Sequence, residues 1–237
     1  MKVFSLVFLI GVLAATSTSR AADITGLITL TGTPPAEVPI TPLMNDPTCG
    51  PLHTNTPTTH FYVVGPNGEF ADVVVSLKDG GGNTITGKST GASEPPVELD
   101  QKGCLYTPQI LAIQTGQTLT VKNLDPCVHN VHTTSKAGNP EHNDVQMPGA
   151  PDLHYTFDKP EMFMRFNCDI HPWMFAWVSV FDNPYFDISG QDGKFVIKDV
   201  PPGKYIVVAD HRKLGVQTQA VDVADKNVTV NFTFTAK

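Results

Sequence analysis

The sequence predicts an all-β protein. Short runs of β-branched and aromatic residues recur along the chain and are separated by turn residues, since the 237 residues include 20 Pro and 19 Gly. Amphipathic helical patterns are nearly absent. A chain of this length can form two small domains, each with a modest core of its own.

Residues 1–22 are predicted to be a secretion signal. Lys2 supplies a positive charge, an apolar run follows from Val3 to Ala15, and small residues near Ala22 offer a cleavage site. The run is too short for a comfortable membrane span, so a retained anchor helix is the weaker alternative. We expect a mature chain that begins near Asp23, is periplasmic or secreted, and has no integral membrane segment.

The predicted mature chain is acidic. Residues 1–22 contain two basic residues and no acidic one, so their removal changes the net charge from −7 to −9. This charge disfavours nucleic acid and anionic membranes as partners and favours proteins with basic docking surfaces.

Residues 23–98 are predicted to form an N-terminal arm and the first strands of a sandwich. The arm includes the segment 39–59, which is rich in Pro, Thr and Asn. Alternating runs predict strands at 24–31, 61–64, 71–78 and 97–99, with the second and third paired as a hairpin.

Residues 99–182 are predicted to form the core of this sandwich. Strands are expected at 109–114, 118–122, 128–132, 155–157, 162–167 and 175–181, and the segment 133–151 is expected to be irregular. A period of two places Met162, Met164, Phe166 and Cys168 on one face. Cys168 therefore follows a strand whose inner face is apolar.

Residues 183–237 are predicted to be a second small domain, because the composition changes at 182–184. The runs 192–197 and 200–208 alternate as two strands joined by a Pro-Pro-Gly turn, and 216–234 supplies more strands. This part resembles the carboxypeptidase regulatory-like, or transthyretin-like, β-sandwich family, whose signature is a DG-x-F-x-I strand followed by PPG-x-Y.

The motif Cys168-x₂-His171-x₂-Met174 presents a thiolate, an imidazole and a thioether within one short segment. These soft and borderline ligands suit copper. Together with His129, they would form a trigonal plane of two histidines and one cysteine with Met174 as a weak axial ligand, which is typical of a blue copper site. The alternative is a loop with a buried thiol and a surface histidine.

Neighbouring residues favour the copper hypothesis. Asn130 is placed to tie its loop to the loop that holds Cys168. Pro172, Trp173 and Phe175 would surround His171 with an apolar docking surface for electron exit, since weak redox encounters use small interfaces. Core packing is the alternative role for the two aromatic residues.

Residues 120–181 resemble the cupredoxin family, in particular its amicyanin-like and plastocyanin-like members, on the basis of the Cys-x₂-His-Pro-aromatic-Met loop and the His-Asn-Val-His stretch at 129–132. The resemblance implies a Greek-key β-sandwich with one type 1 copper held by His129, Cys168, His171 and Met174, and it implies that His132 is not a ligand. Cys127 and the long segment 133–151 depart from small cupredoxins. The whole chain resembles secreted cupredoxin-like proteins with a regulatory-like tail domain, described as methylamine-utilisation-like.

Three cysteines remain if Cys168 binds copper. Cys49 and Cys104 are the preferred disulfide, which leaves Cys127 as a free thiol near His129. A pairing of Cys127 with Cys104 or Cys49 remains open.

The other histidines have less specific signals. Cys49, His53 and His60 could form a second metal site, but a disulfide with surface histidines is favoured. His142 and His154 are expected to be solvated or structural, with an accessory copper site as the alternative, and His211 is expected in a surface turn.

The predicted function is that of a secreted electron carrier rather than an enzyme. No Ser-His-Asp order, Gly-rich phosphate loop or pair of carboxylates stands out in the sequence. The carrier would pass single electrons between protein redox partners. The alternatives are a copper-binding or sequestering module without electron transfer, and a metal-free extracytoplasmic binding module.

Overall fold

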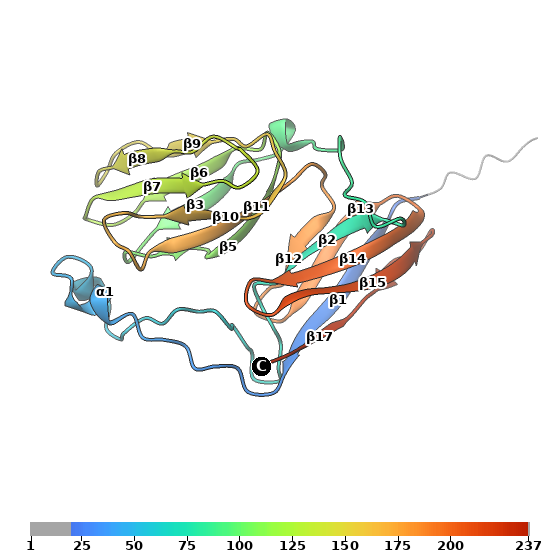
Figure 1. Ribbon diagram of the computed structural model, residues 1–237, viewed down its shortest axis with the longest axis horizontal. Coiled ribbons are helices and arrows are strands. Elements are labelled where there is room, and N and C mark those ends of the chain that lie inside the picture. The colour runs from blue at the N-terminus through green and yellow to red at the C-terminus, as the bar shows by residue number, and fades with distance from the viewer. Residues whose placement is uncertain (1–19, 237) are drawn as a thin grey trace, which may run out of the picture.

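A computed structural model describes residues 20–236, and the regular secondary structure within them is almost entirely strands (Figure 1). The all-β prediction is confirmed. Residues 1–19 of the predicted signal lie outside the described range. The strands are β1 (Ala22–Thr31), β2 (Val74–Asp79), β3 (Val97–Gln101), β4 (Tyr106–Thr107), β5 (Ile110–Gln114), β6 (Leu119–Asn123), β7 (His129–Thr134), β8 (Asn143–Gln146), β9 (Leu153–Tyr155), β10 (Glu161–Asn167), β11 (Phe175–Phe181), β12 (Phe186–Ile188), β13 (Lys194–Val200), β14 (Gly203–His211), β15 (Gly215–Val223), β16 (Val228–Thr229) and β17 (Phe232–Thr235).

The helical part of the described range is small. It consists of the short helix α1 (Thr41–Asn45) and two 3₁₀ turns, η1 (Gly50–Leu52) and η2 (Gly91–Ser93). None of these has the length and apolar character needed to span a bilayer.

The first sandwich is formed by β3 to β11. One sheet has the order β5-β11-β10-β7-β8 and the other β4-β3-β6-β9. Inward side chains of both sheets, among them Leu99, Val121, Val131, Phe166 and Val178, are fully buried in one apolar cluster. Each sheet thus buries one face against the other, as the alternating sequence pattern requires.

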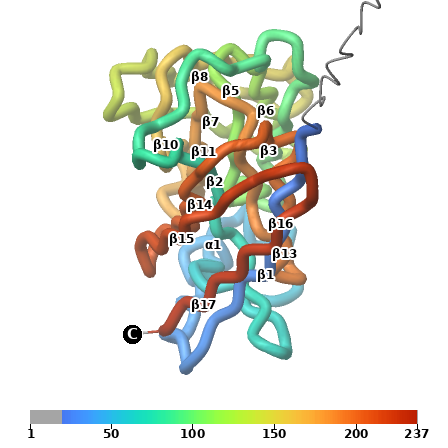
Figure 2. The backbone as a smooth tube through the Cα atoms, turned by 90° about the vertical axis from the view of Figure 1, so that its right-hand side faces the viewer, coloured from blue at the N-terminus to red at the C-terminus, as the bar shows by residue number. Residues whose placement is uncertain are grey.

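The second sandwich is formed from both ends of the chain. Its sheets are β13-β1-β16, in which β17 also pairs with β1, and β12-β2-β14-β15. Figure 2 shows β1 beside β13 and β17. The predicted assignment of all of 23–98 to the first sandwich is therefore wrong for β1 and β2. The alternation of Ile24, Ile28 and Leu30 reports which face of β1 is buried, but not which strands it meets.

The predicted pair of strands around the Pro-Pro-Gly turn is also arranged differently. The two strands exist, but β13 pairs with β1 whereas β14 pairs with β2 and β15. The turn at 201–203 carries the chain from one sheet to the other. Likewise, the predicted hairpin of 61–64 with 71–78 is reduced to a single bridge between Val64 and Phe70, and β2 pairs elsewhere.

Two further differences lie near the ligand loop. The pairing of β10 with β11 shifts register between Glu161 and Met164, and Phe163 has a φ of 52°. This bulge turns Met162 outward, so that it is 39% exposed while Met164 is buried. Within the segment expected to be irregular, β8 forms a strand that pairs with β7.

Residues 32–63, here called the arm, connect β1 to the rest of the chain and contain α1. The arm runs along the lower side of both sandwiches in Figure 1. Ile40 and Leu43 are buried with the disulfide Cys49–Cys104, which ties the arm to the first sandwich. The sandwiches themselves meet through an apolar cluster that includes Val74, Ile110 and Phe181.

Candidate metal centre

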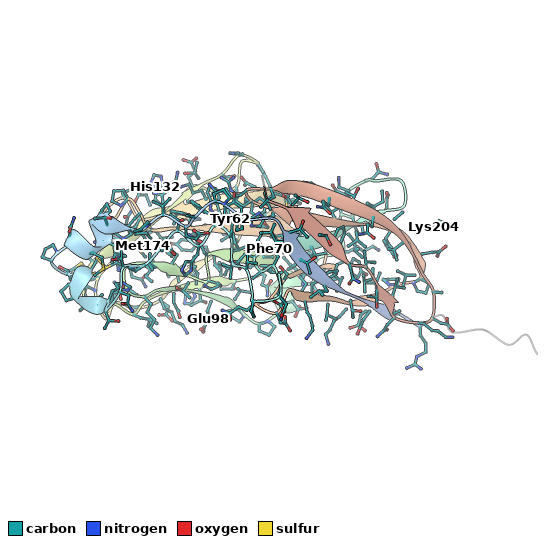
Figure 3. The ribbon with its side chains drawn as sticks, turned by 90° about the horizontal axis from the view of Figure 1, so that it is seen from below. Tyr62, Phe70, Glu98, His132, Met174 and Lys204 are labelled. Carbon is teal, nitrogen blue, oxygen red and sulfur yellow. A yellow bond between two sulfur atoms is a disulfide. The ribbon has the colours of Figure 1, made fainter. Side chains whose placement is uncertain are left out.

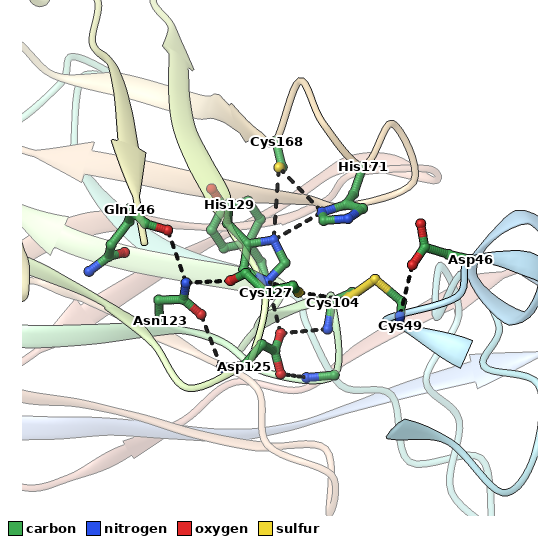
Figure 4. A network of polar contacts seen from close by, with 12 residues as sticks. Asp46, Cys49, Cys104, Asn123, Asp125, Cys127, His129, Gln146, Cys168 and His171 are labelled. Carbon is green, nitrogen blue, oxygen red and sulfur yellow. Dashed lines mark hydrogen bonds and ion pairs between the residues drawn. A yellow bond between two sulfur atoms is a disulfide. The ribbon is translucent and has the colours of Figure 1, made fainter. Parts of the chain in front are cut away.

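Three of the predicted ligands converge at one end of the first sandwich. His129 opens β7, Cys168 follows β10, and His171 lies in the loop that leads to β11. The two Nδ1 atoms of His129 and His171 are 3.0 Å apart, and Cys168 Sγ is 4.0 Å from the first and 3.7 Å from the second (Figure 4). All three side chains are buried.

The fourth predicted ligand, Met174, ends the same loop. Cys168 N donates to Met174 O at 3.1 Å, and Met174 N donates to His171 O at 2.8 Å. These bonds close the loop between the antiparallel strands β10 and β11. The Met174 side chain is fully buried with Cys168 in the core of the first sandwich. Figure 3 shows Met174 at the end of the molecule opposite Lys204.

The donor atoms lie at separations close to those of ligands on one metal ion. With metal bonds of about 2.0 Å to imidazole nitrogen and about 2.3 Å to thiolate sulfur, trigonal donors lie about 3.5 Å apart for two nitrogens and about 3.7 Å apart for nitrogen and sulfur. The two nitrogen–sulfur separations of 3.7 and 4.0 Å lie near the expected value, and the nitrogen–nitrogen separation of 3.0 Å is about 0.5 Å shorter than expected. The two nitrogens and the soft sulfur, with Met174 beside them, fit copper.

Asn130 joins the two segments that carry the ligands, as the sequence predicted. Its backbone N–H donates to Cys168 Sγ at 3.5 Å, and its Oδ1 accepts from Asp169 N at 2.7 Å. Its Nδ2 donates to Asn143 Oδ1 at 2.8 Å and to Asp169 Oδ2 at 3.2 Å. The side chain is itself buried, so it holds the β7 end against the Cys168 loop.

His132 lies outside the cluster. Its Nδ1 is 2.9 Å from Asp169 Oδ2 in a half-exposed ion pair. An odd offset along β7 places it on the face opposite to His129, which agrees with its expected non-ligand role.

The sequence patterns did not identify Asp125, which contacts His129 at Nε2, the ring nitrogen that is not in the ligand cluster. His129 Nε2 donates to Asp125 Oδ2 at 2.9 Å, and the carboxylate also accepts from the backbone N–H groups of Gly103 at 2.6 Å and Cys104 at 2.7 Å. Asp125 is 6% exposed. A signal was present, since Asp125-Pro126 forms a turn four residues before the histidine.

These contacts set the charge states of the cluster. Burial alone would lower the pKa of His129, but the hydrogen bond to Asp125 and the contact with Cys168 outweigh it and raise that pKa. Burial would raise the pKa of Cys168, but hydrogen bonds from His129 and the backbone of Asn130 lower it overall. Burial and the neighbouring His129 lower the pKa of His171. A thiolate and a neutral imidazole are the forms that bind metal.

The disulfide Cys49–Cys104 is the pairing that the sequence favoured, and Cys127 is a free thiol. Cys127 Sγ is 3.6 Å from Cys104 Sγ and 3.6 Å from His129 Nε2. Burial, with the nearby Asp125 charge, raises the pKa of Cys127 to about 11. An unreactive thiol therefore separates the disulfide from the ligand cluster.

The predicted docking surface is only partly open. Pro172 is exposed, but Trp173 and Phe175 are half-buried. Trp173 packs on His171 with ring centroids 5.3 Å apart and donates from Nε1 to Cys104 O at 3.1 Å, while Phe175 stacks on Phe61 of the arm at 6.1 Å. The arm partly covers both rings, so less of the predicted docking surface is exposed than expected, and its role in docking stays a prediction.

The other histidines discussed above do not join the ligand cluster. His53 Nε2 contacts Gly103 O at 2.7 Å, His154 Nδ1 contacts Thr120 Oγ1 at 3.1 Å, and the His142 ring packs on Tyr155. His211, expected in a surface turn, is 2% exposed and packs against Phe70 with ring centroids 4.4 Å apart. The apolar faces of the second sandwich enclose it because β14 extends to that residue.

Comparison with known proteins gives distant structural likenesses. No family model matches the chain, and no curated protein sequence matches it. A copper-containing nitrite reductase from Thermus scotoductus is 24% identical over 37% of this chain and 23% of its own length, with a TM-score of 0.34. A purple cupredoxin from Nitrosopumilus maritimus is 21% identical over 35% of this chain and 98% of its own, with a TM-score of 0.31.

An amicyanin mutant in its Cu(I) form is 19% identical over 45% of this chain and 97% of its own length, with a TM-score of 0.33. The chain spans less than a quarter of the nitrite reductase. The protein is all-β, and His129, Cys168 and His171 lie together at one end of its first sandwich with Met174 in the same short loop.

Proposed function

We propose that this protein binds one type 1 copper ion and carries single electrons between protein redox partners. The observation that supports this most strongly is the convergence of the His129 and His171 Nδ1 atoms with Cys168 Sγ within 3.0–4.0 Å, in a buried pocket at the end of a sandwich. Two imidazoles, a thiolate and a thioether are the donor set of blue copper sites.

In this proposal His129, Cys168 and His171 hold the metal and Met174 is the weak axial ligand. Bound copper supplies a reversible one-electron change. The chain supplies rigidity, since the ligand loop is closed by two backbone hydrogen bonds, Asn130 holds the Cys168 segment, and Asp125 orients His129. A cage held this firmly limits ligand movement between oxidation states.

The partners would approach from the His171 side. His171 is 5% exposed and Pro172 beside it is exposed. The chain carries a net charge of −7, which supports partners with basic docking surfaces. The predicted signal at 1–22 supports a periplasmic or secreted location, where such partners would be met.

We also infer that the second sandwich is a carboxypeptidase regulatory-like domain. The support is the Asp192-Gly193-x-Phe195 strand and the Pro201-Pro202-Gly203-x-Tyr205 turn, in which Tyr205 Oη donates to Pro201 O at 2.9 Å. In this proposal the domain has no part in binding copper.

Absorption and EPR spectra of the copper-reconstituted protein test the assignment. We expect an intense band near about 600 nm from the copper–thiolate bond, lost in Cys168→Ser. The matched control is Cys127→Ser, which removes the other free thiol. That variant should keep the band, and a colourless copper-loaded wild-type protein would overturn the proposal.

Voltammetry separates electron transfer from copper storage. An electron carrier gives a reversible one-electron wave on the copper-loaded protein, with little change in the spectrum after repeated cycles. A sequestering module takes up copper without such a wave. A metal-free binding module shows no copper uptake.

A further inference from the structure

A second candidate site is a cavity that Trp173 helps to line. It is a cavity of about 670 Å³ where the arm and the two sandwiches meet. Trp173 and Phe175 from the first sandwich, Ile40 and Val63 from the arm, and Asp72 next to β2 contribute to its wall. Its volume is in the range of pockets that hold small organic molecules, which often form where domains meet.

Charge restricts what the cavity can hold. Asp72 is the one acidic residue in its described lining, and no Lys or Arg is present there. Within residues 20–236 no hydrogen bond or ion pair is formed by the Asp72 side chain, although its backbone N–H donates to Ser189 O. Burial raises the pKa of Asp72, and the nearby His60, which also lines the cavity, lowers that pKa to a smaller extent. A half-buried carboxylate that forms no hydrogen bond or ion pair would be stabilised by a cationic ligand.

The aromatic residues support the same ligand class. The faces of tryptophan and phenylalanine rings attract ammonium groups and also bind apolar carbon skeletons. The cavity thus combines a carboxylate for the charge with Trp173 and Phe175 for the body of the ligand.

Two residues that line the cavity have an uncommon backbone conformation. Two non-glycine residues in the lining, His60 and Asp72, have positive φ values of 52° and 62°. Such conformations are uncommon for residues with a side chain and are concentrated at ligand sites. Both residues line the cavity.

We propose that this cavity binds a small organic ammonium ion with an apolar body, its nitrogen against the Asp72 carboxylate and its hydrocarbon part against Trp173 and Phe175. Because the Trp173 ring also packs on His171, the bound molecule would lie next to the candidate metal centre. The binding site itself does not depend on the copper assignment.

Isothermal titration calorimetry of the full chain with 2-naphthylmethylammonium tests this proposal. The neutral alcohol, 2-naphthylmethanol, and the anion, 2-naphthoate, are matched probes of similar shape. We expect the ammonium compound to bind and the carboxylate not to. Running the titration with and without copper separates this result from the outcome of the copper experiment.

The variant Asp72→Asn removes the charge and keeps the shape, and asparagine tolerates a positive φ better than other residues. We expect it to weaken ammonium binding about tenfold or more and to leave binding of the alcohol unchanged. Asp199→Asn is the control, because Asp199 is an exposed aspartate with a φ of 53° outside the cavity. Equal affinity for the three probes, or equal losses in both variants, would overturn the proposal.

Discussion

The two sandwiches share an architecture but differ in what they bury. The second sandwich encloses an apolar cluster with phenylalanines such as Phe195 and Phe232 at its centre. The first has a similar apolar centre, but at one end it buries Asp125, His129, Asn130 and His171. Burying polar groups is unfavourable unless they are hydrogen-bonded, and these side chains are bonded to one another or to the backbone. Both regions are two-sheet sandwiches, and a few buried polar residues at one end of the first distinguish it from the second.

The sandwiches also differ in how the chain builds them. The first is continuous, from β3 to β11, whereas the second combines β1 and β2 with strands from the C-terminal end. A continuous domain can be recognised from local patterns. A domain formed from distant segments cannot be recognised in this way, because no local pattern identifies the strand with which another strand pairs.

The largest expected effect on stability comes from a substitution in the core of the second sandwich. Phe195→Ala should destabilise the second sandwich by about 3–5 kcal/mol, since Phe195 is fully buried. We expect the copper spectrum of the folded variant to be unchanged. Urea unfolding followed by circular dichroism, which reports the strands of both sandwiches, and by copper absorbance measures both. If the copper band were lost at denaturant concentrations where the first sandwich remains folded, the two regions would not be independent.

The disulfide should stabilise the first sandwich and the arm. Cys49 and Cys104 are separated by 55 residues, and closing such a loop contributes about 4 kcal/mol in the chain-entropy model. The double variant Cys49→Ser, Cys104→Ser should lose stability of that order in urea, with the transition of the second sandwich unmoved. A loss confined to the second transition would contradict this assignment.

His211 should make the second sandwich sensitive to acid. Burial lowers its folded-state pKa to about 4. The unfolded chain takes up the proton near its ordinary pKa of about 6.5 while the folded chain does not. Stability is therefore lost as the pH falls from about 6.5 to about 4, by about 3 kcal/mol in total.

His211→Gln has no group that titrates in this range. Unfolding free energies of wild type and variant, measured across pH 4–7, should converge as the pH falls. Parallel pH curves for the two proteins would show that His211 is not the group responsible.

The smallest expected effect concerns the hydrogen bond behind His129. Asp125→Asn should weaken copper binding by about 10–100-fold, because the carboxylate orients the ring and increases its basicity as a ligand. Competition titrations with a copper chelator measure the change. His132→Gln is the control and should leave the affinity unchanged, since His132 contacts Asp169 and no ligand. Equal affinities in the wild type and Asp125→Asn would remove Asp125 from the centre.

Local patterns predicted most strands and the residues of the candidate ligand cluster. The alternation before Cys168 correctly placed Met164 and Phe166 inside, and the spacing of His171 and Met174 placed both in one short loop. The period of two predicted the wrong face for Met162. A bulge shifts the register of β10 at this point, and the extra residue interrupts the alternation.

The sequence by itself determined which residue types stand at the ends of the strands, and so it determined the donor set of the candidate copper site. The tertiary structure alone decided that β1 pairs with β13 and β17, that Asp125 reaches His129, that the arm covers Trp173, and that His211 is buried. The reason is physical. Periodicity along a strand reports how its own side chains divide between two faces, whereas these contacts join segments far apart in the chain, and only the packing of whole sheets brings them together.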